Sequence, residues 1–207
     1  MKKAISLIVL GSLLTVDASL ACTPPHYRTP ADRLNAMNSP LPLMQVSDNG
    51  QYLLKMTPTL WGMNNGFIEK RSAYGAVFKI RQNGDLQQLW TVKDLHPQAK
   101  NEYFMSPRYA IFIDDEGNTI KVVSSILKNA KNPDVIWLYK QGKLLRAYSY
   151  SYFVKNTSKG LYNTCGTASW LDYNTPLNFK ASSLNFKSID GLSWTINLKT
   201  GAVTKPK

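Results

Sequence analysis

The sequence predicts an all-β protein assembled from antiparallel hairpins. Short glycine-containing turns between two apolar arms recur at Gly50, Gly84, Gly117, Gly142 and Gly201. Glycine takes the positive φ that tight hairpin turns require. Aromatic residues, which favour strands, are frequent, with 11 Tyr, 7 Phe and 5 Trp. Five hairpins leave room for few and short helices, for which Val92–Ala99 and Tyr152–Ser158 are the candidates.

The N-terminus has the pattern of an export signal. Lys2 and Lys3 precede the apolar stretch 4–16, and small-residue cleavage sites follow Ala18 and Ala21. The apolar stretch is shorter than the roughly 20 residues that a membrane-spanning helix needs. We therefore expect a signal peptide over residues 1–21, a periplasmic or secreted protein and no transmembrane span.

Two cysteines, Cys22 and Cys165, allow alternative interpretations. In an oxidising compartment they are expected to form a disulfide, which would stabilise the chain by about 4–5 kcal/mol through closure of a long loop. Alternatively, Ser19-Leu20-Ala21-Cys22 is a lipobox and Cys22 carries a lipid anchor. Two free thiols are the third alternative.

The expected mature chain is a proline-rich arm over residues 22–42, followed by a single β-rich domain over residues 43–207. The predicted hairpins of this domain are LMQVSDNGQYLLKM, AVFKIRQNGDLQQLWTV, RYAIFIDDEGNTIKVV, DVIWLYKQGKLLRAYSY and SWTINLKTGAVTKP. A shorter repeat, Leu177–Lys180 and Leu184–Lys187, predicts one more pair of strands.

The hairpin Asp134–Tyr150 is predicted to lie at the centre of the fold. Trp137 and Tyr139 alternate with Ile136 and Leu138, so its first strand is apolar on both faces. Both faces of such a strand must be covered by other parts of the protein. We therefore expect this strand to lie between two packed layers.

The phrases VSDNGQYLL and WLYKQGKLLRAYS resemble the hairpin repeats of β-propeller blades in small exported bacterial proteins of an uncharacterised family. The resemblance extends over Leu43–Tyr150 and lacks the Gly-His and Trp-Asp signatures of one common propeller type. It implies a partial or small β-propeller-like arrangement. A two-sheet β-sandwich with similar hairpins is the alternative, and neither fold implies an activity.

Few residues fit catalysis or metal binding. Cys165 is a candidate nucleophile, and His26 and His96 are the two histidines that could serve as its base. The acidic stretch Asp114–Asn118 carries oxygen ligands suited to calcium, but it also lies where a hairpin turn is expected. We predict no catalytic residues, no cofactor and no metal site.

Charge is the remaining signal, with 25 Lys and Arg against 13 Asp and Glu. Export argues against nucleic acid as the partner, because the anions outside the cytoplasm are lipid head groups and envelope polymers. Aromatic residues outside the clearest strands could instead form a carbohydrate platform, and the candidates are Trp61, Tyr103, Trp170 and Tyr173.

The sequence thus predicts a monomeric, non-catalytic envelope protein whose basic surface engages an anionic polymer, a lipid or an acidic protein. Two alternatives are a periplasmic hydrolase of an envelope component and an immunity or inhibitor protein.

Overall fold

The computed structural model describes residues 43–93, 95, 109–127, 131–156, 163–164, 167–172, 174–180 and 182–204, together with Thr29 and Ala31. Most of these residues form antiparallel strands, and helix α2 (Tyr150–Phe153) has only four residues. The prediction of an all-β protein with short helices is confirmed. The signal peptide and almost all of the proline-rich arm lie outside the described residues and stay predictions.

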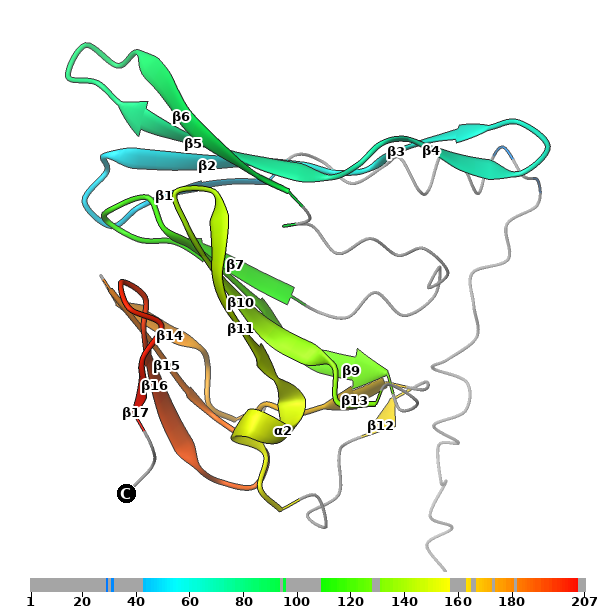
Figure 1. Ribbon diagram of the computed structural model, residues 1–207, viewed down its shortest axis with the longest axis vertical. Helices are drawn as coiled ribbons and strands as arrows, with labels where there is room; N and C mark the ends of the chain where they lie inside the picture. The colour runs from blue at the N-terminus through cyan, green and yellow to red at the C-terminus, as the bar shows by residue number, and fades with distance from the viewer. Residues whose placement is uncertain are drawn as a thin grey trace, which may run out of the picture.

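Three four-stranded antiparallel sheets follow one another along the chain (Figure 1). The first sheet contains β1 (Leu43–Val46), β2 (Tyr52–Thr57), β5 (Tyr74–Ile80) and β6 (Leu86–Lys93). The central sheet contains β7 (Tyr109–Ile113), β8 (Thr119–Val123), β10 (Asp134–Lys140) and β11 (Lys143–Ser149). The third sheet contains β14 (Asn178–Lys180), β15 (Ser183–Lys187), β16 (Ser193–Asn197) and β17 (Val203–Thr204).

Two smaller sheets complete the described strands. The hairpin of β3 (Leu60–Met63) and β4 (Phe67–Arg71) lies between β2 and β5 in the chain and projects from the stack of sheets (Figure 1). A three-stranded sheet contains β12 (Asn163–Thr164), β13 (Thr167–Ser169) and β9 (Ser125–Leu127). No closed barrel is formed by the strands that the structure describes.

The three large sheets form layers, with the central sheet between the other two (Figure 1). One hydrophobic cluster joins the first and central sheets and includes Leu54, Val77 and Ile111. A larger cluster joins the central and third sheets and includes Leu138 and Ile196. The sheets have the strand number of propeller blades, and their face-to-face stacking is that of a sandwich.

The predicted turn glycines are all confirmed. Positive φ angles occur at Gly50 (70°), Gly84 (86°), Gly117 (78°), Gly142 (76°) and Gly201 (67°). Each of these glycines lies in the turn of a predicted hairpin, namely β1–β2, β5–β6, β7–β8, β10–β11 and β16–β17. The short repeat is also a hairpin, in which Phe179 of β14 pairs with Leu184 of β15.

Strand β10 has the two apolar faces that its sequence predicts. Ile136 and Leu138 are buried in the cluster toward the third sheet. Tyr139 is buried toward the first sheet, and the half-buried Trp137 packs against the same cluster. Its partner β11 is an edge strand, so of the two strands of this hairpin only β10 lies in the interior of the sheet. The prediction of a central hairpin is therefore correct for one of its two strands.

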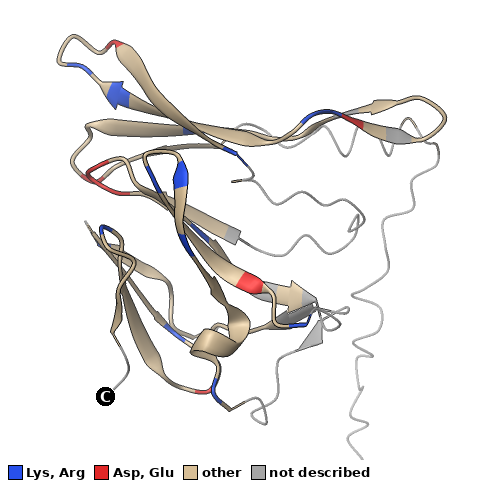
Figure 2. Cartoon of the chain, in the orientation of Figure 1, with Lys and Arg blue, Asp and Glu red and all other residues tan. Residues whose placement is uncertain are grey.

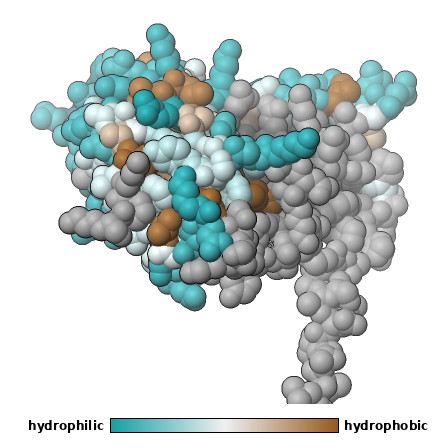
Figure 3. All heavy atoms as spheres, turned by 60° about the horizontal axis from the view of Figure 1, so that its bottom comes forward, coloured by the Kyte–Doolittle hydropathy of each residue, from teal (hydrophilic) through white to brown (hydrophobic). Residues whose placement is uncertain are grey.

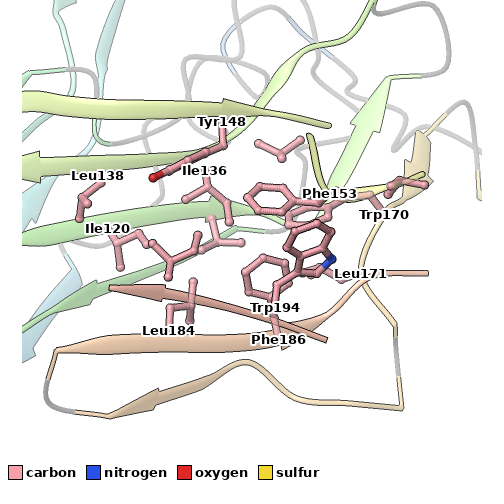
Figure 4. Packing of buried hydrophobic residues seen from close by; sticks show 14 of the residues in the cluster. Ile120, Ile136, Leu138, Tyr148, Phe153, Trp170, Leu171, Leu184, Phe186 and Trp194 are labelled. Atoms are coloured by element: carbon pink, nitrogen blue, oxygen red, sulfur yellow. The ribbon is translucent and has the colours of Figure 1, made fainter. Parts of the chain in front are cut away.

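The larger cluster has an aromatic centre made by side chains from different elements (Figure 4). The Phe153 ring of α2 stacks on Trp170 with ring centroids 5.5 Å apart and meets Phe186 and Trp194 edge to face at 5.1 and 5.4 Å. Edge-to-face and offset aromatic pairs stabilise beyond the area they bury. Helix α2 therefore holds a fully buried ring between two sheets.

Some elements differ from the sequence-based predictions. The β3–β4 hairpin was not predicted, although Asn64-Asn65-Gly66 is a turn signal, and Asn65 and Gly66 both have positive φ. The helix predicted at Val92–Ala99 is wrong at its start, because Val92 and Lys93 end strand β6. The helix predicted at Tyr152–Ser158 begins two residues earlier, at Tyr150.

Candidate interaction surface

The first sheet buries one face and exposes the other. Leu54, Met56 and Val77 point toward the central sheet, so the side chains that alternate with them point away from it. We call this second side the outer face. By the strand register it carries Met44, Val46, Leu53, Lys55, Phe78, Ile80, Leu86 and Lys93, together with Thr57, Tyr74, Ala76, Gln88 and Thr91. In Figure 1 the first sheet is the top layer, and no other labelled element lies above it.

The outer face exposes aliphatic side chains to an unusual degree. Met44 is 63% exposed, and Val46 and Leu86 are each 51% exposed. Lys55 and Lys93 are exposed on the same face. Single exposed apolar residues are ordinary, but several on one sheet face mark an interaction site.

An open groove lies at the end of this face where β1–β2 and β5–β6 turn. Its volume is about 770 Å³, and it is lined by Gly50, Gln51 and residues 79–83. Lys79 and Arg81 supply its positive charge, and among the described residues neither forms an ion pair. Asp85 lies beside the groove, where its carboxylate accepts a hydrogen bond from Asn83 Nδ2 at 2.7 Å.

Basic residues elsewhere are dispersed, as the sequence indicates. Figure 2 shows Lys and Arg on all three sheets and their turns, with acidic residues between them. Figure 3 turns the lower side of Figure 1 toward the viewer, and on the part of that side that the structure describes the apolar surface forms small areas among polar residues. Charge alone therefore does not select a site. On the outer face, exposed aliphatic side chains and lysines occur together.

The predicted aromatic platform is contradicted at Trp170. Its side chain is fully buried, and its Nε1–H donates to the carbonyl oxygen of Val123. The Trp61 side chain, Tyr103 and Tyr173 lie outside what the structure describes. The sequence predicts a surface position for Trp170 because this residue stands outside any recognisable strand repeat, and its burial depends on the packing of two sheets.

The candidates for cysteine and histidine chemistry are outside the described residues. Cys22, Cys165, His26 and His96 all fall in this category, so the disulfide and the lipid anchor stay predictions. In the part of the chain that the structure describes, no group of three or more His, Cys, Asp or Glu side chains could hold a metal ion.

The acidic stretch Asp114–Asn118 is the turn between β7 and β8. The Asp114 carboxylate is buried and accepts hydrogen bonds from the backbone N–H groups of Glu116 (2.9 Å) and Asn118 (2.7 Å) and from Asn118 Nδ2 (2.9 Å). Burial raises the pKa of Asp114, and these hydrogen bonds offset only part of the rise. Its oxygens are thus used to shape the turn.

The same turn connects all three sheets. Asn49 of the β1–β2 turn donates its backbone N–H to Asp115 Oδ1 at 2.7 Å. Glu116 forms an ion pair with Lys199 of the β16–β17 turn, which lowers the pKa of Glu116 and raises that of Lys199. These two interactions hold the turns of the three sheets together. Asp115 and Glu116 thus have a structural role in this contact.

A second buried carboxylate, Asp190, lies in the turn between β15 and β16. Asp190 accepts hydrogen bonds from Ser188 Oγ (2.6 Å) and from the backbone N–H groups of Lys155 (2.7 Å) and Asn156 (3.2 Å). Burial alone would raise the pKa of Asp190, but the hydrogen bonds outweigh it and the pKa is lowered. Trp194 Nε1 donates to Ser188 Oγ at 3.0 Å, which extends the network to the aromatic core.

We expect Asp190→Asn to lower the free energy of unfolding by about 2–3 kcal/mol at pH 7, because several donors lose a charged acceptor. Since the pKa of the folded state is lowered, this contribution is present above the pKa of an unfolded aspartate. It is lost as the pH falls through the lower pKa of the folded state. Urea unfolding at pH 7 and about pH 3 should therefore show the difference from wild type shrinking in acid.

Asp114→Asn is the matched control, because the Asp114 pKa is raised instead of lowered. Removing this charge relieves a desolvation cost at neutral pH, so we expect a change within about 1 kcal/mol. Equal losses for Asp114→Asn and Asp190→Asn at pH 7 would contradict the assignment of opposite roles to the two carboxylates.

Comparison of the chain with family models, with curated proteins and with solved structures found no match. The fold and the outer face are therefore interpreted from this chain alone. Among the described residues, no helix is both long and apolar enough to cross a membrane.

Proposed function

We propose that this is an exported, non-catalytic binding protein whose basic surface engages an anionic component of the bacterial envelope. The observation that carries the proposal is the outer face, where Lys55 and Lys93 accompany exposed aliphatic side chains on the side of the first sheet away from the core. The adjoining groove adds Lys79 and Arg81.

The net charge of +12 supports an anionic partner. Such a charge attracts anionic surfaces over a distance of about 10 Å at moderate salt and increases the rate of encounter. The alternative hydrolase finds no support among the described residues, because its candidate nucleophile and bases lie elsewhere in the chain.

The test compares two charge-reversal pairs that change the net charge equally. Lys55→Glu with Lys93→Glu alters the outer face, whereas Lys140→Glu with Lys143→Glu alters the exposed β10–β11 turn. Binding of each variant to heparin and to phosphatidylglycerol vesicles is measured at about 50 and 200 mM salt. We expect the outer-face pair to lose more than about tenfold in affinity and the control pair less than about threefold.

Two results would contradict the proposal. If the wild-type protein binds neither heparin nor anionic vesicles at low salt, it does not engage anionic surfaces. If both charge-reversal pairs weaken binding equally, binding depends on net charge and the outer face is not the site.

A further inference from the structure

We propose that the outer face docks on the anionic phospholipid surface of a membrane, with its aliphatic side chains inserted among the lipids. This inference rests on the proposed function and specifies the partner of the same face. It adds an apolar contribution that an anionic polymer cannot provide, because a polysaccharide has no acyl phase to receive exposed Met and Leu side chains.

The apolar residues of the outer face form one continuous strip. Val46 pairs with Leu53, and Leu53 pairs with Phe78 across the sheet. Ile80 follows on the same side of β5 and pairs with Leu86. Cross-strand neighbours on one face of a sheet lie close enough for their side chains to interact. The strip thus presents adjoining apolar side chains on one side of the first sheet.

Positive charges lie where lipid phosphates would be. Lys55 pairs directly with Met44, so a cation stands beside the most exposed aliphatic side chain of the face. The long Lys stem can follow apolar surface while its ammonium stays at the head groups. Arg81 lines the groove at one end of the strip.

The charge balance of this region favours an anionic surface. Lys55 and Lys93 lie on the outer face, whereas Lys79 pairs with Tyr52 and points to the other side of the sheet. Arg81 adds a positive charge in the β5–β6 turn, and two aspartates in the turns, Asp48 and Asp85, oppose these cations. Each basic residue near an anionic bilayer contributes attraction that falls off within a Debye length. Long-range attraction and short-range insertion would therefore act at the same face.

The charged and aromatic composition of the outer face favours lipid over a protein partner. Protein interfaces are enriched in aromatic residues, Met and Arg and depleted in Lys, with Trp, Tyr and Arg as their hot spots. The cations of the outer face, Lys55 and Lys93, are both lysines, and its most exposed apolar side chains, Met44, Val46 and Leu86, include neither Trp nor Tyr.

The test uses the full chain and two serine pairs at exposed positions. Met44→Ser with Val46→Ser alters the strip. Leu144→Ser with Leu145→Ser alters exposed leucines on β11, which are 56% and 40% exposed, and is the control. Vesicles of phosphatidylglycerol and phosphatidylcholine, a phosphatidylglycerol monolayer, lipopolysaccharide and heparin are the probes. Urea midpoints establish that both variants are folded.

We expect Met44→Ser with Val46→Ser to weaken vesicle binding by about tenfold or more and to reduce the rise in monolayer pressure, because buried aliphatic groups carry this part of the affinity. Heparin binding of the same variant should stay unchanged, as should vesicle binding of the Leu144 and Leu145 control.

Four outcomes would overturn the inference. They are unchanged vesicle binding by the Met44 and Val46 variant, an equal loss in the control, binding to lipopolysaccharide without binding to phosphatidylglycerol, and a wild-type dimer that the variant dissociates. The first of these, with heparin binding intact, would leave the proposed function standing. Absence of binding to every anionic probe would instead remove the proposed function as well.

Discussion

Trp170→Ala is expected to lower the free energy of unfolding by about 3–5 kcal/mol, as for other large aromatic side chains removed from a core. The Trp170 ring is fully buried and stacks on Phe153 with centroids 5.5 Å apart. It also meets Phe186 edge to face at the same separation. Its removal leaves a cavity at the place where α2, the central sheet and the third sheet meet (Figure 4).

Trp170→Phe keeps the prediction testable if the alanine variant does not fold, since domains of this kind have only about 5–15 kcal/mol of stability. Phenylalanine preserves a ring but cannot donate to the Val123 carbonyl, so we expect a loss of about 1–2 kcal/mol. Urea unfolding followed by circular dichroism provides the measurement.

Trp137→Ala is the control for these tryptophan substitutions. Trp137 is half-buried, and the Lys121 ammonium lies over its ring at 4.6 Å from the centroid. We expect Trp137→Ala to lower the free energy of unfolding by about 1–2 kcal/mol, because a half-buried side chain buries less apolar area than a fully buried one. A larger loss for Trp137→Ala than for Trp170→Ala would place the main core between the first and central sheets and contradict the structure.

Gly142→Ala is expected to cost about 2–5 kcal/mol, the sum of backbone strain and overpacking. Gly142 has a φ of 76°, which an L-residue adopts only with strain. A Cβ added there would lie 2.4 Å from the backbone carbonyl oxygen of Thr91 in β6. Because that oxygen belongs to a strand backbone, the whole β10–β11 turn must move away from the first sheet.

Gly84→Ala isolates the strain from the overpacking. Gly84 has a similar φ of 86°, but a Cβ there would meet no atom within 4 Å. We therefore expect Gly84→Ala to lower the free energy of unfolding by only about 1–2 kcal/mol, which is the cost of the left-handed conformation. Both variants are compared by chemical unfolding under identical conditions. Equal losses would show that the contact between Gly142 and β6 does not constrain the fold.

The local pattern predicts the hairpins well, because a turn glycine and its flanking alternation act within a few residues. Gly50, Gly84 and Gly201 all take the expected positive φ. The two-sided burial of Ile136 and Tyr139 was also predicted, since a strand that is apolar on both sides must lie between layers. These features depend on neighbours in sequence and are readable from it.

Residues whose role depends on distant partners were not predicted. The sequence predicts a surface position for Trp170, which is buried, and gives no signal for Asp190, whose carboxylate accepts hydrogen bonds from residues 34 and 35 positions away. The outer face was also missed. Met44 and Leu86 are ordinary apolar strand residues in sequence, and a periodic pattern does not state which of two faces a second sheet will cover.

The all-β hairpin architecture and the excess of positive charge follow from the sequence, because turn chemistry and side-chain alternation are local and charge is additive. The order of the layers, the burial of particular carboxylates and the exposure of one apolar face depend on contacts between residues far apart in the chain, so they appear only in the folded structure. Gly142 and Gly84 are an example. The sequence predicts a tight turn at both positions, but a Cβ would clash with the backbone of β6 at Gly142 and with nothing at Gly84.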